Sequence, residues 1–377
     1  MSNKRPVYLD YAASTPVDEE VLNEIIPYFT TIYSNPSNTI NVLGQSASNA
    51  VKRAEEQIKD LLNAWDYEIV FTSGATESIN TALKSLFALY GNNRNKIITC
   101  KTEHKAVLSV CEYLETLGAE IEYLPVDING NISLFDLEKS ITENTLAVAL
   151  MSVNNETGVI HDIDKISKIC QNKSVNFLCD ATQAVGKLEF DLEQVSPDFL
   201  IFSGHKMYAP KGVGVLLIRK NENLIPLIHG GGQQTNLRSG TLNVPGIVGV
   251  GKAAELLKDK RDSEFFRITQ LQKEFESKLL ETGKVAIVGK EAKRSPFISN
   301  LHFLNNDSEE IIFPLKDKLF FSTGSACTTQ IIEPSHVLRG MGMENAQAEN
   351  CLRFSFGKHT STEDIQIALT LLKNIVD

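Results

Sequence analysis

The segment "PDFLIFSGHKMYAPKGVGVLLIR", residues 197–219, places a lysine between two apolar, β-prone stretches. The residues before Lys206, at 197–202, and those after it, at 213–219, each predict a buried strand. A lysine is ordinarily a solvated surface charge, but one that follows a buried strand of an α/β protein lies at the sheet edge where ligands bind. Burial there would lower the pKa of Lys206 and make a neutral, nucleophilic amine available.

The rest of the first two-thirds of the chain alternates strand and helix patterns. Further strands are expected at 68–74, 96–100, 121–126, 146–153 and 175–180, and helices at 76–91 and 105–118. Repeated alternation of this kind predicts an α/β fold, with a mostly parallel central sheet and helices on both of its faces.

The pattern changes near residue 250, where a long, charged, amphipathic helix is expected at 251–283. We expect this helix to lead into a smaller α+β lobe. The predicted division is a large domain over 16–255 and a small domain made of 1–15 and 256–377.

Composition and charge restrict the function. The chain has 377 residues and a net charge of −10, which disfavours direct binding to nucleic acid or to an anionic membrane. The first residues lack a signal-peptide core, and the longest apolar runs are strand-length. No two cysteines have CxxC spacing, so we expect free thiols, a cytoplasmic location and no metal; the cysteines are at 100, 111, 170, 179, 327 and 351.

The turn "TSGATES", residues 72–78, leads from a strand into a helix. Free backbone N–H groups near Gly74 and Ala75, together with Thr76, would suit a phosphate group at the positive end of the helix dipole. The alternative is ordinary helix capping by Ser73 or Thr76.

Two strands that are consecutive in the chain end in groups that could face the same edge of the sheet. Asp180 ends the strand at 175–180, and Lys206 follows the next strand. A pyridoxal phosphate enzyme needs this pair, a lysine for the aldehyde and an acid for the ring nitrogen. His104 follows the strand at 96–100 and could stack on a flat cofactor or move protons. An Asx turn for Asp180 and a structural role for His104 are the alternatives.

Two polar loops are also candidates. Asn154 and Asn155 follow the strand at 146–153, where they could bind a ligand or form a turn. The glycine-rich loop at 229–241 contains Arg238 and Thr241, and it is either a flexible surface loop or one that crosses to another subunit.

Two further residues could act on a substrate. Cys327 lies among glycine, serine and threonine residues at 321–335, which predicts an exposed and mobile thiol that is a candidate nucleophile. The other five cysteines lie in apolar segments typical of a core. Arg353 in "LRFSFG" could clamp a carboxylate with two parallel hydrogen bonds, or form a surface ion pair.

Together these stretches resemble the cysteine desulfurases, which are pyridoxal phosphate enzymes of fold-type I in the class V aminotransferase group. The resemblance covers nearly the whole chain in order, through "YLDYAASTPVD", "SNPSN", "FTSGATES", "TEHKAV", "VNNETGV", "DATQAVGK", "SGHKMYAPKGVG", "RSGT", "GSACTT", "EPSHVLRGMG" and "LRFSFG". The segment around Cys327 resembles the longer kind found in the iron–sulfur cluster branch.

The resemblance implies a role for each matched residue. Lys206 would bond to the cofactor and move protons at the substrate, Asp180 would pair with the ring nitrogen, and His104 would stack on the ring. Gln183 would bond the ring hydroxyl. The residues that would hold the phosphate are Ala75, Thr76, Ser203, His205 and, from a second subunit of a homodimer, Thr241.

The resemblance also implies a reaction. Asn155 and Arg353 would hold the carboxylate of L-cysteine, and Cys327 would take its sulfur, leaving alanine and an enzyme persulfide for an acceptor protein that docks near Cys327. The sulfur could go to iron–sulfur clusters, tRNA or DNA. Selenocysteine lyase, aminotransferase and a non-catalytic sulfur carrier are the alternatives. One departure is Asn41, because related sequences usually carry a histidine a few residues after "NP".

Overall fold

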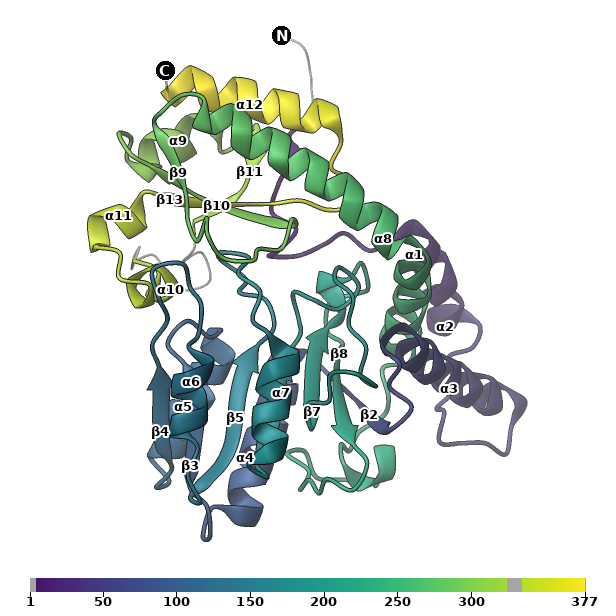
Figure 1. The fold of residues 1–377 in the computed structure, drawn as a ribbon. Helices are drawn as coiled ribbons and strands as arrows, with labels where there is room; N and C mark the ends of the chain where they lie inside the picture. Colours follow the sequence, from purple (N-terminus) through teal and green to yellow (C-terminus); the bar gives the residue numbers. More distant parts are fainter. Residues whose placement is uncertain (1–4, 324–333, 377) are drawn as a thin grey trace.

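A seven-stranded sheet forms the centre of the larger lobe in the computed structural model, which describes residues 5–323 and 334–376 (Figure 1). The strand order is β2-β8-β7-β6-β5-β3-β4. The seven strands lie where the sequence predicts them, at β2 (Tyr67–Thr72), β3 (Lys96–Cys100), β4 (Glu120–Leu124), β5 (Thr145–Met151), β6 (Asn176–Asp180), β7 (Phe199–Ser203) and β8 (Gly214–Arg219).

The sheet is mostly parallel, as predicted. Every pair from β4 to β7 is parallel, whereas β8 runs antiparallel to both of its neighbours, β7 and β2. The antiparallel direction follows from the short connection between β7 and β8, because a parallel pair needs a longer crossover.

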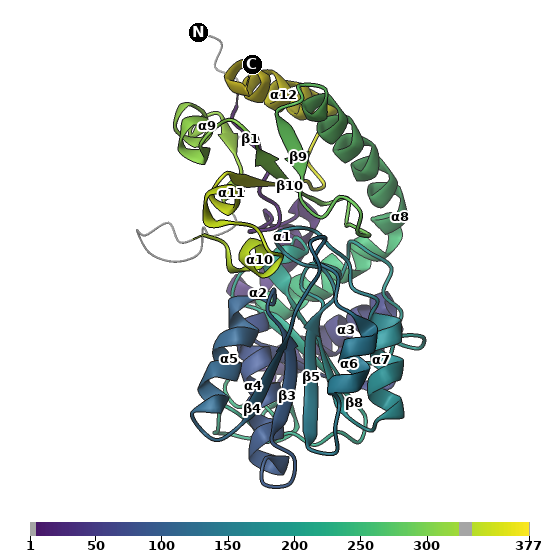
Figure 2. The same cartoon turned by 60° about the vertical axis from the view of Figure 1, so that its left-hand side comes forward.

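Helices cover both faces of this sheet (Figures 1 and 2). Alternate residues of each strand point to opposite faces, so Phe177 and Leu178 belong to different apolar clusters. One face packs against α4 (Ala75–Tyr90) and α5 (Lys105–Glu115). The other face packs against α3 (Val42–Leu62), α6 (Leu134–Ser140), α7 (Ile163–Asn172) and the first part of α8 (Val244–Leu280).

Helix α8 passes from one lobe to the other as the sequence predicts, although it begins earlier than residue 251 (Figure 1). It has 37 residues and is therefore about 55 Å long. Its first half packs against α3 at Gly251, where an added Cβ would lie 2.5 Å from the Cα atom of Ala54. Two short helices, α1 (Glu19–Ile25) and α2 (Pro27–Thr30), precede α3.

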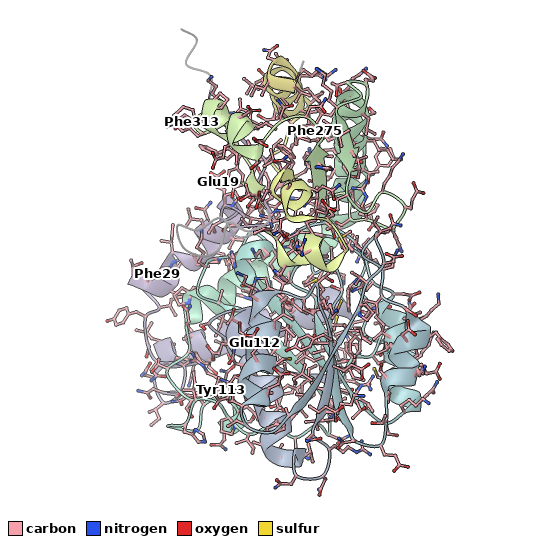
Figure 3. The ribbon with its side chains drawn as sticks, turned by 90° about the vertical axis from the view of Figure 1, so that its left-hand side faces the viewer. Glu19, Phe29, Glu112, Tyr113, Phe275 and Phe313 are labelled. Carbon is pink, nitrogen blue, oxygen red and sulfur yellow. The ribbon has the colours of Figure 1, made fainter. Side chains whose placement is uncertain are left out.

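The smaller lobe has a separate apolar core. Figure 3 labels Phe275 of α8, a fully buried residue of this core, which also contains Val7 and Leu9 from the start of the chain. The lobe contains β1 (Val7–Tyr8), β9 (Val285–Ile287), β10 (Ile298–Phe303), β11 (Leu319–Phe320), β12 (Ser322–Thr323), β13 (Cys351–Ser355), α9 (Ser308–Leu315), α10 (His336–Gly340), α11 (Asn345–Glu349) and α12 (Thr362–Val376).

The first strand ties the beginning of the chain to the smaller lobe. β1 pairs in parallel with β11, and β12, β13, β10 and β9 form a four-stranded antiparallel sheet. The division of the chain at residues 15 and 255 remains a prediction, and the two separate cores support it. Within the described ranges, no helix is both long and apolar enough to cross a membrane.

Candidate cofactor and substrate site

Several predicted site residues lie where parallel strands of the large sheet end. His104, Asp180 and Lys206 follow or end β3, β6 and β7. The carboxyl ends of parallel strands meet at one edge of a sheet, and this edge is where α/β proteins bind ligands. The charges of Asp180 and Lys206 both act on His104, so the structure brings these three residues together.

His104 also begins helix α5. Its Nδ1 atom accepts a hydrogen bond of 3.1 Å from the backbone N–H of Ala106. The neutral ring therefore carries its proton on Nε2. Desolvation by the surrounding protein lowers the pKa of His104, and the positive charge of Lys206 lowers it further while Asp180 opposes the change. The structural role that the sequence allowed as the alternative is thus correct for Nδ1, whereas Nε2 remains for a ligand.

Lys206 lies in the short 3-10 helix η1 (Gly204–Lys206), directly after β7. Its Nζ atom donates hydrogen bonds of 2.6 Å to the carbonyl oxygens of both Ala12 and Ala13. The Nε2 atom of Gln183 donates to the same Ala12 carbonyl at 2.9 Å. The segment after β1 thus crosses the sheet edge and brings Lys206 and Gln183 together, a contribution that the sequence reasoning missed because backbone carbonyls carry no sequence signal.

Asp180 is the last residue of β6, and it is buried. Its Oδ1 atom accepts a hydrogen bond of 2.9 Å from the N–H of Thr182, which is the Asx-type turn proposed as the alternative. A carboxylate has lone pairs on both oxygens, so the turn and a ligand contact are compatible. The buried hydroxyl of Thr182 has no hydrogen-bond partner among the described residues.

The start of helix α4 is suited to an anion. Gly74 is its N-cap residue, no side chain caps it, and Thr76 is exposed beside it, so the alternative of capping by Ser73 or Thr76 is wrong. The Ser203 hydroxyl lies 3.8 Å from the point where a Cβ of Gly74 would be. Backbone N–H groups, a helix dipole and a hydroxyl therefore face one space.

Gly214 allows this arrangement, because a Cβ at this position would lie 2.4 Å from the Cα atom of Gly74. His205 follows Ser203 by two residues, and its Nδ1 atom lies 3.3 Å from the Ser14 hydroxyl. Burial, followed by the charge of Lys206, lowers the pKa of His205 to about 4. His205 is therefore a neutral hydrogen-bonding group near pH 7.

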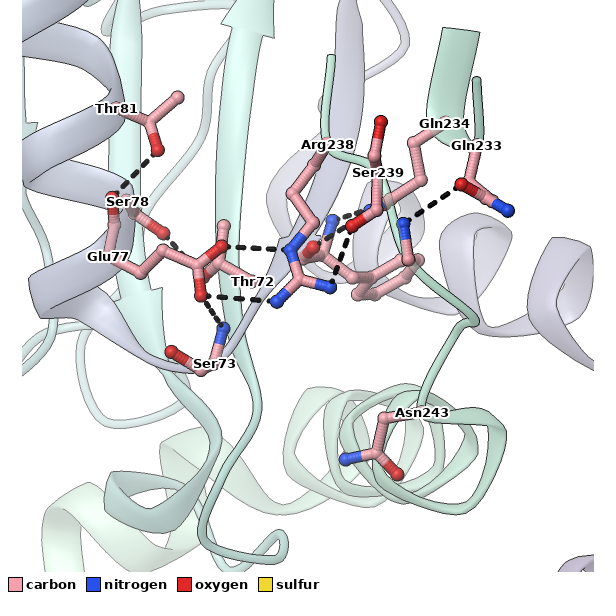
Figure 4. A network of polar contacts seen from close by, with 12 residues as sticks. Thr72, Ser73, Glu77, Ser78, Thr81, Gln233, Gln234, Arg238, Ser239 and Asn243 are labelled. Atoms are coloured by element: carbon pink, nitrogen blue, oxygen red, sulfur yellow. Dashed lines mark hydrogen bonds and ion pairs between the residues drawn. The ribbon is translucent and has the colours of Figure 1, made fainter. Parts of the chain in front are cut away.

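The loop at 229–241 is anchored to the start of α4 (Figure 4). Arg238 Nε lies 2.9 Å from Glu77 Oε1, and Glu77 Oε2 accepts a 2.8 Å hydrogen bond from the backbone N–H of Ser73. Burial alone would raise the pKa of Glu77, but the bonds from Arg238 and Ser73 lower it. Thr241 lines a cavity of about 230 Å³ together with Ser73 and Arg238. Its contact with a second subunit remains a prediction.

Arg353 lies in β13 and is buried, so the alternative of a surface ion pair is wrong. Its Nη1 atom donates a 2.9 Å hydrogen bond to the backbone carbonyl of Asn155, and its Nη2 atom lies 2.9 Å from Asp10 Oδ1. Burial raises the pKa of Asp10, while Arg353 opposes the change. The sequence reasoning missed Asp10, although a single acid within the apolar "VYLDYAA" was a usable signal.

The two candidate asparagines differ. Asn154 forms the turn, because its Oδ1 atom accepts hydrogen bonds from the backbone N–H groups of Glu156 and Thr157. Asn155 is half-buried and contacts Arg353 through its backbone. At the departure from related sequences, Asn41 is the N-cap residue of α3, and its side chain accepts a 2.8 Å hydrogen bond from the N–H of Gly44.

Cys327, the predicted nucleophile, lies outside the described residues. The described chain resumes at residue 334, and His336 is held near His104, because its Nε2 atom lies 2.8 Å from the carbonyl oxygen of Glu103. The other five cysteines are buried and unbridged, which confirms that they belong to the core. Burial raises the pKa of each, for example that of Cys170 and Cys351 to about 12.

Comparison with known proteins identifies the family. The aminotransferase class-V family model matches residues 7–368. The cysteine desulfurase IscS of Buchnera aphidicola subsp. Baizongia pistaciae is 42% identical over 99% of this chain and 93% of its own length.

Solved structures give the same result. A NifS-like protein superposes with a TM-score of 0.92 and 35% identity, covering 98% of this chain and 99% of that protein. SspA in complex with cysteine superposes with a TM-score of 0.84 and 37% identity, covering 93% and 98% of the two chains. The chain therefore belongs to the cysteine desulfurases of the aminotransferase class-V family.

Proposed function

We propose that this protein is a pyridoxal phosphate-dependent cysteine desulfurase. It would convert L-cysteine to L-alanine and leave the sulfur as a persulfide on Cys327. The observation that carries the proposal is the convergence of Lys206, Asp180 and the uncapped start of α4 at one edge of the large sheet.

The residues present fit the cofactor. Lys206 offers an amine, Asp180 a buried carboxylate for the ring nitrogen, and Gln183 an amide for the ring hydroxyl. When bound, pyridoxal phosphate supplies an aldehyde and a ring that withdraws electrons from the substrate. Its phosphate would be held at the start of α4 by Ala75, Thr76, Ser203, His205 and, from a second copy of the chain, Thr241.

The other residues of the site would bind substrate and move protons. Arg353, fixed by Asp10 and the Asn155 carbonyl, would hold the cysteine carboxylate at the remaining N–H groups of its guanidinium. Lys206 would move protons at the α and β carbons of the substrate. His104 would stack on the ring and present its Nε2–H group toward the ligand.

The five described cysteines are unsuited to take the sulfur, because burial keeps their thiols protonated, and this supports Cys327 as the nucleophile. The reaction balances without an external oxidant. The Cys327 thiolate attacks the cysteine sulfur, the C–S bond breaks, and the β carbon takes the electron pair and a proton to become the methyl group of alanine. A sulfur-acceptor protein would then dock near Cys327 and receive the persulfide sulfur.

The test is the reaction of L-cysteine with the purified protein, in the presence of pyridoxal phosphate and a thiol reductant. Alanine and sulfide should form in equal amounts over many turnovers, because the reductant releases the persulfide sulfur. A keto acid in place of alanine would contradict the proposal and would indicate an aminotransferase. Strong preference for selenocysteine would indicate a selenocysteine lyase.

A second prediction concerns Arg353. Replacing Arg353 by alanine together with Asp10→Asn should lower kcat/KM for L-cysteine by about a hundredfold, because two charge-assisted hydrogen bonds to the carboxylate are lost. The effect should appear mainly as a higher KM. The Asp10 change is included because removing Arg353 alone would leave a partly buried carboxylate without its ion-pair partner.

The matched control is Arg219→Ala with Asp198→Asn, which removes another arginine–aspartate pair at the opposite edge of the sheet. Its KM should match that of the wild type. An unchanged KM in the Arg353 variant, measured with the cofactor band intact, would remove Arg353 from the substrate site.

A further inference from the structure

A second lysine lies within the cofactor site. Lys187 is only 6% exposed, and its Nζ atom donates a 2.7 Å hydrogen bond to Oε1 of Gln183. A buried lysine is normally paired with a carboxylate, because its charge loses the stabilisation of water. Within the ranges that the structure describes, no carboxylate forms an ion pair with Lys187.

The charges around Lys187 are mainly positive. Burial, and then the charges of Lys206 and Arg353, lower its pKa to about 7. Lys187 also lines a cavity between the lobes whose other titratable residues are Asp18, Tyr208, Lys260, Glu264 and Lys358. The two acids among them form ion pairs with residues other than Lys187, Asp18 with Lys358 and Glu264 with Arg267. Lys187 therefore has little negative charge nearby to compensate its own positive charge, either in the cofactor site or in this cavity.

Hydrogen bonds connect Lys187 to Lys206. Gln183 accepts from Lys187 through Oε1 and donates through Nε2 to the Ala12 carbonyl, which also accepts from Lys206. These two partners decide which end of the amide is oxygen and which is nitrogen. The nitrogen retains a second N–H group, so Gln183 can act as a donor toward a ligand oxygen.

We propose that Lys187 is a positioning residue of the cofactor site, which orients the Gln183 amide through its hydrogen bond to Oε1 and places a second cationic group close to Lys206. The inference rests on the proposed function. The physical basis is reciprocal, because two cations that lower each other's proton affinity favour the neutral form of each. A neutral Lys206 is the form that can act as a nucleophile. Other titratable groups whose charges interact with that of Lys206 are Asp10, His104 and His205.

The test is a pH titration of the visible absorbance of the protein loaded with pyridoxal phosphate. In Lys187→Met, the midpoint of the absorbance change should rise by about one pH unit, because a neighbouring positive charge is lost. In Lys187→Arg, which keeps the charge, the midpoint should stay at or below that of the wild type. The control is Lys96→Met, which removes another buried lysine. Lys96 begins β3, at the end of the strand far from the cofactor site, and is paired with Glu122.

The outcomes separate this inference from the proposed function. A Lys187→Met midpoint equal to that of the wild type would overturn the inference, as would an equal rise in Lys187→Met and Lys187→Arg. If Lys187→Met does not fold, Lys187→Arg decides, since a midpoint above that of the wild type contradicts the role of the charge. A wild-type protein without a visible band, or a band that survives Lys206→Ala unchanged, would instead contradict the proposed function.

Discussion

Replacing Lys206 by alanine is expected to lower the turnover of L-cysteine by at least about a thousandfold. The variant loses the amine that would bond to the cofactor and the group that would move protons at the substrate. It also loses the two hydrogen bonds to the carbonyls of Ala12 and Ala13. Alanine formation measures the loss of turnover. The visible absorbance of the purified variant measures the loss of the bond between the lysine and the cofactor.

The control for this experiment is Lys220→Ala. Lys220 is an exposed lysine directly after β8, and it is paired with Asp66 at the far end of the sheet. Its activity and visible band should equal those of the wild type. Thermal unfolding of both variants would show whether Lys206→Ala is folded, and a folded variant that retains turnover would exclude Lys206 as the catalytic lysine.

Replacing Cys327 by serine is expected to lower sulfide release by at least about a thousandfold, the order of loss seen when an enzyme loses its nucleophile. A serine hydroxyl cannot hold a persulfide, whereas binding of the cofactor does not use this side chain. The variant should therefore keep the visible band and bind L-cysteine without releasing sulfide. Mass spectrometry of alkylated protein would measure the persulfide directly.

Cys170→Ser is the matched control, because it makes the same chemical change in a thiol buried against the large core. It should cost some stability and retain sulfide release. Sulfide output from Cys327→Ser equal to that of the wild type would assign the nucleophile elsewhere in the chain.

Local sequence patterns were sufficient for most of the large lobe. Most strands from β2 to β8 are short apolar runs, and the residues that end or follow such runs, His104, Asp180 and Lys206, meet at one edge because parallel strands end together. The antiparallel direction of β8 was not predicted. This direction follows from the short connection between β7 and β8, which the apolar pattern of the strands does not reveal.

The substrate side was harder to predict because its contacts join distant parts of the chain. Asp10 meets Arg353 because the start of the chain pairs with distant strands of the smaller lobe, with β11 at Val7 and with the end of β13 at Asp10. Lys187 was missed for another reason. Its sequence neighbourhood is that of an ordinary loop lysine, and only burial beside Gln183 makes it unusual.

The pairing of β1 with β11 also has a consequence for biosynthesis. The apolar core of the large lobe contains residues only up to Ala254, so this lobe can pack while the rest of the chain is still being made. Val7, by contrast, pairs with Leu319, close to the other end of the chain. The segment at Ala12 and Ala13 can reach Lys206 earlier, because hydrogen bonds join the neighbouring Thr15 to His205 and Tyr208 of the large lobe. Val7 and Leu9, however, have no core to enter until Leu319 has been made, so they remain exposed on the nascent chain for most of its synthesis.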